Sequence, residues 1–408
     1  MAKEKENRIL GEIYEWLLCA YIVLAPINNA LNHYGIYATV VLTAMAVFGL
    51  CLVCKLVGHH PPNLMDYCAL VVAMVLGIQC VIQRFERVSI TSQWVYTVLL
   101  YTIFLTLPSK MNMKRIYCAV YVASLLGAMF SIVLGIAEGS VTRTATSVDG
   151  SLAVIGIVTV LFAQEDFEKT EKYKLLKILA FFACLIVAGF GMSRARIVLI
   201  LCLLVVKVLF SGGSVLISGR VSATVLLSIP FLIVLFFVII RLETVGNVLA
   251  SIENRFVDGF QSLLRDKEIS VGWQGFESAW FLGRGWGELG YRYNFTFRTY
   301  FNHCMYVAIL ARGGITLGIP LLISFLWLIR DALRSKNLLV IVMLTMFFLL
   351  GYGNAGIFNY TINSMFIVLI PLLKQSLERV EQERLRQQQI MAGELMQNTV
   401  DGKEEEVI

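Results

Sequence analysis

The best candidates for chemistry in this sequence are arginines and one histidine that stand in its polar segments. They are Arg194, Arg196, Arg265, Arg284 and His303. A guanidinium group is a planar fork of donors that suits bidentate contact with phosphate oxygens, whereas a lysine offers a point charge. An imidazole titrates near neutral pH and can move a proton there. These residue types favour chemistry on a phosphate-bearing substrate, although about half of such arginines pair with acidic neighbours or lipid headgroups and a lone histidine is more often structural.

A glycine-rich turn surrounds one of these arginines. In the run GRGWG, Gly283 and Gly285 flank Arg284, and Trp286 follows. Glycines let a backbone come close to a ligand, but the run is equally compatible with a plain turn, and it lacks the lysine and serine of a phosphate loop. Trp273, Trp280 and Trp286 either stack on sugar faces or belong to an aromatic belt at a membrane surface. The belt is the better interpretation for at least one of them.

The end of this polar stretch predicts a short helix. Asn302 and His303 stand where the sequence turns apolar again. The segment from His303 to Ala311 is too short to cross a membrane. We therefore expect an interfacial or re-entrant helix that breaks at the pair Gly313-Gly314.

The rest of the chain must position these residues, and its composition predicts a membrane protein. Of its 408 residues 58% are hydrophobic and 15% charged, with a mean hydropathy of +0.75. That is too apolar for a soluble globule, and the alternating ten-residue segments of a barrel are missing. The net charge of +6 indicates no nucleic-acid partner, because the basic residues are spread among short loops. The fold class is therefore an all-α integral membrane protein.

We predict about twelve spanning helices from runs of apolar sequence. They cover residues 12–31, 35–57, 64–83, 92–108, 113–137, 148–164, 175–192, 195–211, 220–241, 314–330, 337–354 and 358–374. With both termini on the inner side, thirteen of the fourteen lysines fall inside and twelve of the twenty arginines outside. Lysines inside agree with the usual bias, whereas arginines outside oppose it, which indicates a use for positive charge there. After Lys374 we expect a solvated helix with a disordered end at DGKEEEVI.

Taken in order, these motifs resemble one known family. An SR pair opens a span at Arg194, and Arg265 lies about eighteen residues before the turn Gly283-Arg284-Gly285. His303 then begins a helix that ends in glycines; these are Gly313, Gly314 and Gly318. The arrangement resembles the O-antigen ligase and O-antigen polymerase superfamily over about residues 140–330. The sequence departs from the family at Cys304, where an asparagine usually follows the histidine, and at Ile269, where an aromatic residue is common.

The resemblance implies a bacterial inner-membrane glycosyltransferase. Such an enzyme moves a glycan from an undecaprenyl-pyrophosphate carrier to an acceptor hydroxyl on the periplasmic side, without a metal or other cofactor. It implies that Arg194, Arg265 and Arg284 stabilise the leaving pyrophosphate, with Arg196 a weaker candidate, and that His303 is the base. The chain then divides into helices one to nine (1–241), a periplasmic catalytic loop (242–313), helices ten to twelve (314–374) and a cytoplasmic tail (375–408).

Three functions remain open from the sequence. One dominant outer loop favours a ligase, whose acceptor is lipid A-core. A polymerase would instead use a second carrier-linked glycan as its acceptor. A lipid-linked glycan transporter or flippase would place polar groups at mid-membrane, often in two related halves, and the sequence shows neither feature.

Overall fold

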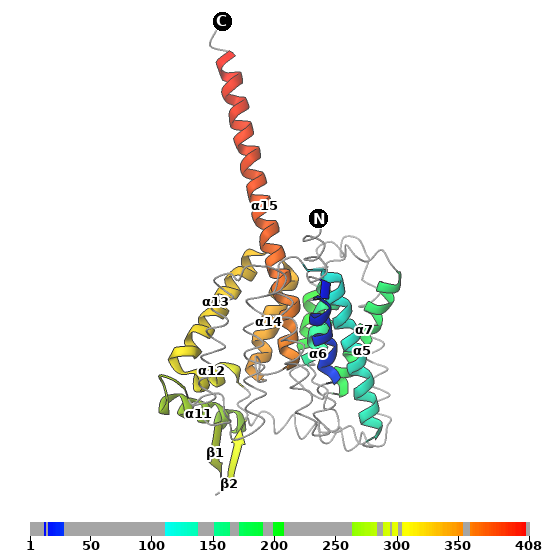
Figure 1. Ribbon diagram of the computed structural model, residues 1–408, viewed down its shortest axis with the longest axis vertical. Helices are drawn as coiled ribbons and strands as arrows, with labels where there is room; N and C mark the ends of the chain where they lie inside the picture. The colour runs from blue at the N-terminus through cyan, green and yellow to red at the C-terminus, as the bar shows by residue number, and fades with distance from the viewer. Residues whose placement is uncertain are drawn as a thin grey trace.

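The computed structural model describes residues 12–13, 15–27, 111–137, 151–163, 171–190, 199–207, 263–283, 289–293, 296–300, 304–353 and 360–404. Apart from one two-stranded hairpin, the regular structure in these residues is helical, and most of it forms a bundle (Figure 1). The helical part of the expected fold is therefore confirmed. The spans predicted at 35–57, 64–83, 92–108 and 220–241 lie outside the described residues.

Three apolar helices pack closely in the first half of the chain: α5 (Met113–Ala137), α6 (Ser151–Phe162) and α7 (Glu171–Phe190). Every residue of α6 is buried. At its centre, a Cβ on Gly156 would overlap the Sγ of Cys184 on α7 and the Oγ of Ser124 on α5. The missing side chain thus lets three helix backbones approach one another, as small residues do in membrane bundles.

The stretch Met113–Leu134 of α5 is long and apolar enough to cross a membrane, and it is the one such stretch in the part of the chain that the structure describes. Shorter apolar helices accompany it; they are Glu15–Ile27, Ser151–Phe162, Met305–Thr316 and Leu338–Gly351. The membrane signal of the structure therefore comes from one helix.

In the second half of the chain, α13 (Ile319–Arg334), α14 (Leu338–Gly353) and α15 (Tyr360–Glu404) follow one another. An aromatic cluster joins them. The ring centroid of Phe347 on α14 lies 5.6 Å from that of Phe325 on α13 and 4.6 Å from that of Phe366 on α15, both edge to face. Such pairs add to the free energy gained by burying the rings.

The last helix, α15, has a buried half and an exposed half. Its residues are buried from Met365 to Leu373 and exposed from Glu381 to Met391, where it extends beyond the bundle (Figure 1). The helix expected after Lys374 is therefore confirmed. The disordered end expected at 401 is wrong as far as Glu404, because adding residues to a formed helix gains one hydrogen bond each.

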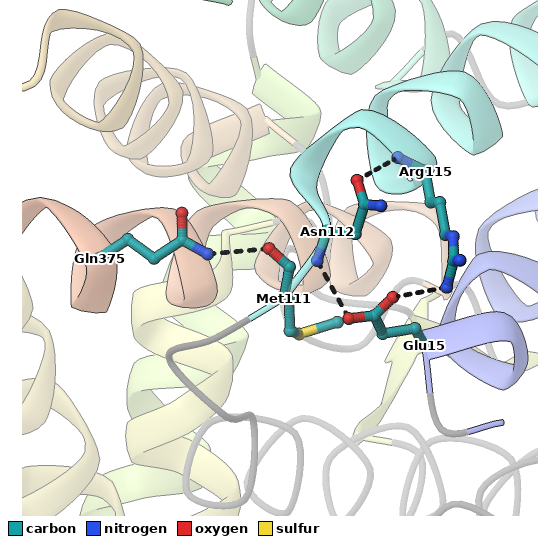
Figure 2. A network of polar contacts seen from close by, with 5 residues as sticks. All are labelled: Glu15, Met111, Asn112, Arg115 and Gln375. Carbon is teal, nitrogen blue, oxygen red and sulfur yellow. Dashed lines mark hydrogen bonds and ion pairs between the residues drawn. The ribbon is translucent and has the colours of Figure 1, made fainter. Parts of the chain in front are cut away.

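A polar network fixes the end of the bundle from which α15 extends (Figure 2). The guanidinium of Arg115 lies 3.1 Å from the carboxylate of Glu15, which also accepts a 3.0 Å hydrogen bond from the backbone N–H of Asn112. The Gln375 amide donates to the Met111 carbonyl at 3.0 Å. The network thus ties the helix Glu15–Ile27 and α15 to the beginning of α5.

The opposite end of the bundle carries α11 (Leu263–Ser278), a hairpin of β1 (Leu289–Tyr293) and β2 (Thr296–Tyr300), and α12 (Met305–Gly313) (Figure 1). The strands are antiparallel, with Tyr293 opposite Thr296. The hairpin is a local addition, in this loop, to the all-α fold that we expected. Every second residue from Tyr291 to Phe297 is aromatic. A period of two is typical of a strand, and our sequence analysis did not use this pattern.

We predict that Glu15→Gln lowers the free energy of unfolding by about 1 kcal/mol, because it removes the charge that Arg115 and the Asn112 N–H both contact. Thermal unfolding of the purified protein in detergent measures the effect. Asp331→Asn is the matched control, since its partner Arg330 has a side chain that is 59% exposed and exposed pairs contribute little. Equal losses in the two variants would contradict a stabilising network.

Candidate functional site

The turn that follows α11 and the break between α12 and α13 meet through their backbones. The N–H of Ile315 donates to the carbonyl of Trp280 at 2.8 Å, and the N–H of Thr316 donates to the carbonyl of Phe281 at 3.2 Å. We call this contact, between residues 280–283 and 312–316, the junction. It joins the beginning of the glycine-rich turn to the glycine pair that ends α12, two motifs that are thirty residues apart in the sequence.

Two glycines make the junction possible. Gly283 has a φ of 75° and Gly314 a φ of 57°, both in the left-handed region that L side chains rarely adopt. A Cβ on Gly283 would overlap the carbonyl of Arg312, and a Cβ on Gly314 would overlap the backbone nitrogen of Gly283. Each glycine is therefore required twice, for its conformation and for the close approach of two backbones. Gly283, expected to admit a ligand or form a turn, forms a turn packed on α12.

The helix break predicted at the glycine pair is present. The α-helix α12 ends at Gly313 and is followed by a π-helix, η1 (Gly314–Gly318), before α13 begins. Pro320 lies in the first turn of α13. A proline is tolerated there because its missing N–H has no partner within the helix.

The short helix α12 is held firmly against α14. The hydroxyl of Tyr306 donates to the carbonyl of Phe348 at 2.9 Å. Met305 is fully buried, and its side chain lies where a Cβ on Gly351 would be. The buried Cys304 is the N-cap residue of α12 and directly follows His303 in the sequence. The position of Cys304, the residue that follows the candidate base, is therefore set by the packing of α12.

Arg312 is a candidate that the sequence reasoning did not assign. Its side chain is 1% exposed, in the last turn of α12, and its carbonyl is the one that Gly283 approaches. A guanidinium keeps its charge even when it is buried, and positive charge is favourable at the C-terminal end of a helix. The signal that could have found it is an arginine directly before a glycine pair at the end of a short apolar helix.

The structure places two of the predicted site residues and does not bring them together. Gly283 lies at the junction, whereas Arg265 lies in the first turn of α11. Ser278, at the other end of α11 and five residues before Gly283, is thirteen residues from Arg265. At 1.5 Å per residue, the length of the helix therefore separates Arg265 from the junction by roughly 20 Å. The other predicted site residues lie outside the described part; they are Arg194, Arg196, Arg284, Gly285, Trp286, Asn302 and His303.

Among the residues that the structure places, no group of three or more His, Cys, Asp and Glu side chains could hold a metal ion. Neither a scan against protein-family models nor a search of curated proteins found a match for this chain.

We predict that Gly314→Ala destabilises the protein by about 2 kcal/mol or more, because a backbone in the left-handed region and an overlap with fixed backbone atoms are both costly. Gly351→Ala is the control, since the Cβ there meets the flexible end of Met305. Thermal unfolding in detergent should show a clearly larger loss for Gly314→Ala. Comparable stability of the two variants would contradict a rigid junction.

Proposed function

We propose that this chain is a multi-pass protein of the bacterial inner membrane with about twelve spanning helices. The composition, the apolar α5 and the arrangement of the ends support this placement. The N-terminal helix begins, and the exposed half of α15 extends, at one end of the bundle, and α11, the hairpin and α12 lie at the other (Figure 1). In the proposed topology the first end is cytoplasmic and the second periplasmic.

The proposed reaction is the metal-independent transfer of an oligosaccharide or polysaccharide from undecaprenyl pyrophosphate to an acceptor hydroxyl. The junction carries this proposal. It holds Gly283 against the end of α12, while Cys304 begins the same helix, about 12 Å away at 1.5 Å per residue. In the sequence, Arg284 directly follows Gly283 and His303 directly precedes Cys304. A cation and a base thus belong to one loop whose two ends are both fixed to α12.

The roles follow from the bonds that change. The acceptor oxygen forms a bond to the anomeric carbon of the glycan while the bond from that carbon to the pyrophosphate breaks. His303 takes the proton of the acceptor hydroxyl. Arg194 and Arg284, with Arg196 in a weaker role, neutralise the charge that grows on the pyrophosphate, an effect that is large where water is excluded.

The remaining residues position the substrate. Arg265, in the first turn of α11, contacts the phosphates of the carrier together with Arg194 and Arg284. We assign sugar contacts to Trp286 and Asn302, and a close approach of the pyrophosphate to Gly285 because glycine has no side chain. Because the sequence has one dominant outer loop, we assign the chain as a ligase with lipid A-core as its acceptor.

The test is transfer by the purified protein, supplied with a carrier-linked oligosaccharide and lipid A-core in the presence of EDTA. We expect a glycosylated core. A longer carrier-linked chain formed without lipid A-core would indicate a polymerase. No product in either reaction, together with movement of the carrier-linked glycan across vesicles, would replace the enzyme by a transporter.

The variant His303→Ala should lose transfer almost completely while its binding of the carrier-linked donor stays close to that of the parent, because the imidazole acts on the acceptor. The control is His33→Ala, the other histidine that the predicted topology places outside. Unchanged product formation by His303→Ala would remove this residue as the base.

The variant Arg194→Lys should be nearly as inactive as Arg194→Ala, because an ammonium group cannot reproduce the bidentate contact of a guanidinium with phosphate oxygens. Initial transfer rates measured at saturating donor distinguish the two variants. A lysine form with parental rates would show that charge alone is needed.

A further inference from the structure

Three large apolar side chains are exposed in succession in the turn that follows α11. Trp280 is 56% exposed, Phe281 55% and Leu282 58%. The two aromatic rings meet edge to face with their centroids 5.6 Å apart. Exposed apolar residues that stand singly are ordinary, but a contiguous group marks a surface that binds something. We call these three residues the aromatic turn.

The exposure of the aromatic turn does not come from a loose chain end. Its backbone is part of the junction, where the carbonyls of Trp280 and Phe281 accept hydrogen bonds from Ile315 and Thr316. With the backbone bound on one side, the side chains are held outward on the other. The protein therefore maintains an apolar surface at a fixed place.

The aromatic turn continues into an apolar stripe on the neighbouring helix. The stripe starts at Ile315, whose N–H donates to the carbonyl of Trp280. Its exposed residues are Ile315, Ile319, Ile323, Leu326 and Trp327. The first four follow one another at intervals of four, four and three residues. Such intervals place side chains along one face of a helix. The surface thus extends from the junction along α13 as far as Trp327.

A charged pair follows Trp327 on α13, before the exposed Leu333 near the end of the helix. The guanidinium of Arg330 lies 6.0 Å from the ring centroid of Trp327 and 2.9 Å from the carboxylate of Asp331. A tryptophan beside an arginine is typical of a membrane–water boundary. The aromatic turn at one end and this pair at the other therefore bracket a surface suited to the hydrocarbon of a bilayer.

We propose that the aromatic turn contacts the lipid of the outer leaflet, with the Trp280 ring at the headgroup level and Phe281 and Leu282 among the acyl chains. The occupant is the membrane lipid itself. This inference depends on the membrane placement proposed above and not on the transfer reaction. It also adds to the proposed transfer function. The junction would lie at the depth of the carrier's phosphate groups, and the carrier would enter the site laterally from the outer leaflet.

The test is tryptophan fluorescence of the full chain in proteoliposomes made with phospholipids brominated either near the headgroup or near the bilayer centre. The parent is compared with Trp280→Phe and Trp327→Phe. We expect the signal lost in Trp280→Phe to be the part quenched by lipid brominated near the headgroup. Leu282→Trp provides a gain of signal that does not require removing a tryptophan, and it should add a component quenched at greater depth.

The outcomes separate this inference from its premise. If acrylamide in the water quenches the Trp280 component and neither lipid does, while lipid quenches the Trp327 component, the inference is overturned and the membrane placement stands. If the acrylamide quenching of Trp280 disappears only when a carrier-linked glycan is added, Trp280 stacks on sugar instead of contacting lipid. If neither component responds to lipid, the placement fails with it. Leu385→Trp, on the exposed half of α15 where Leu385 is 51% exposed, should respond to acrylamide alone.

Discussion

The contact between Gly283 and the backbone of residues 312–314 is the constraint on which the rest of the candidate site depends. Two backbones approach so closely there that neither glycine can carry a side chain. The contact turns a long polar segment into a loop with fixed ends, because α12 is itself held by Tyr306 and Met305 against α14. A loop fixed in this way can hold side chains in place for catalysis without a large domain of its own.

The same contact lies where the apolar helices meet the polar loop. The glycine pair ends α12 and directs the chain into α13, so that the apolar helix begins where the polar loop is attached. Arg312 brings a permanent charge to this boundary. In the proposed enzyme the boundary is also where a lipid-linked pyrophosphate would lie, since its chain needs hydrocarbon and its phosphates need cations.

The helical scaffold could be predicted from the sequence because apolar runs of spanning length leave few alternatives. The bounds predicted for α5 agree with those found, and the break at Gly314 was visible as a glycine pair after a run too short to span. The junction could not be predicted, because a contact between two backbones leaves no mark on side-chain pattern except the glycines themselves. The hairpin was missed because apolar runs outweighed the alternation of aromatic residues from Tyr291 to Phe297.

The central claim is that guanidinium groups and one imidazole meet one carrier-linked glycan near the junction. An experimental map of the protein with that donor bound tests it most directly. We expect the pyrophosphate to contact the guanidinium of Arg194, with the anomeric carbon facing the imidazole of His303. A map that places these two side chains at opposite ends of the bundle, or the pyrophosphate away from both, would contradict the account.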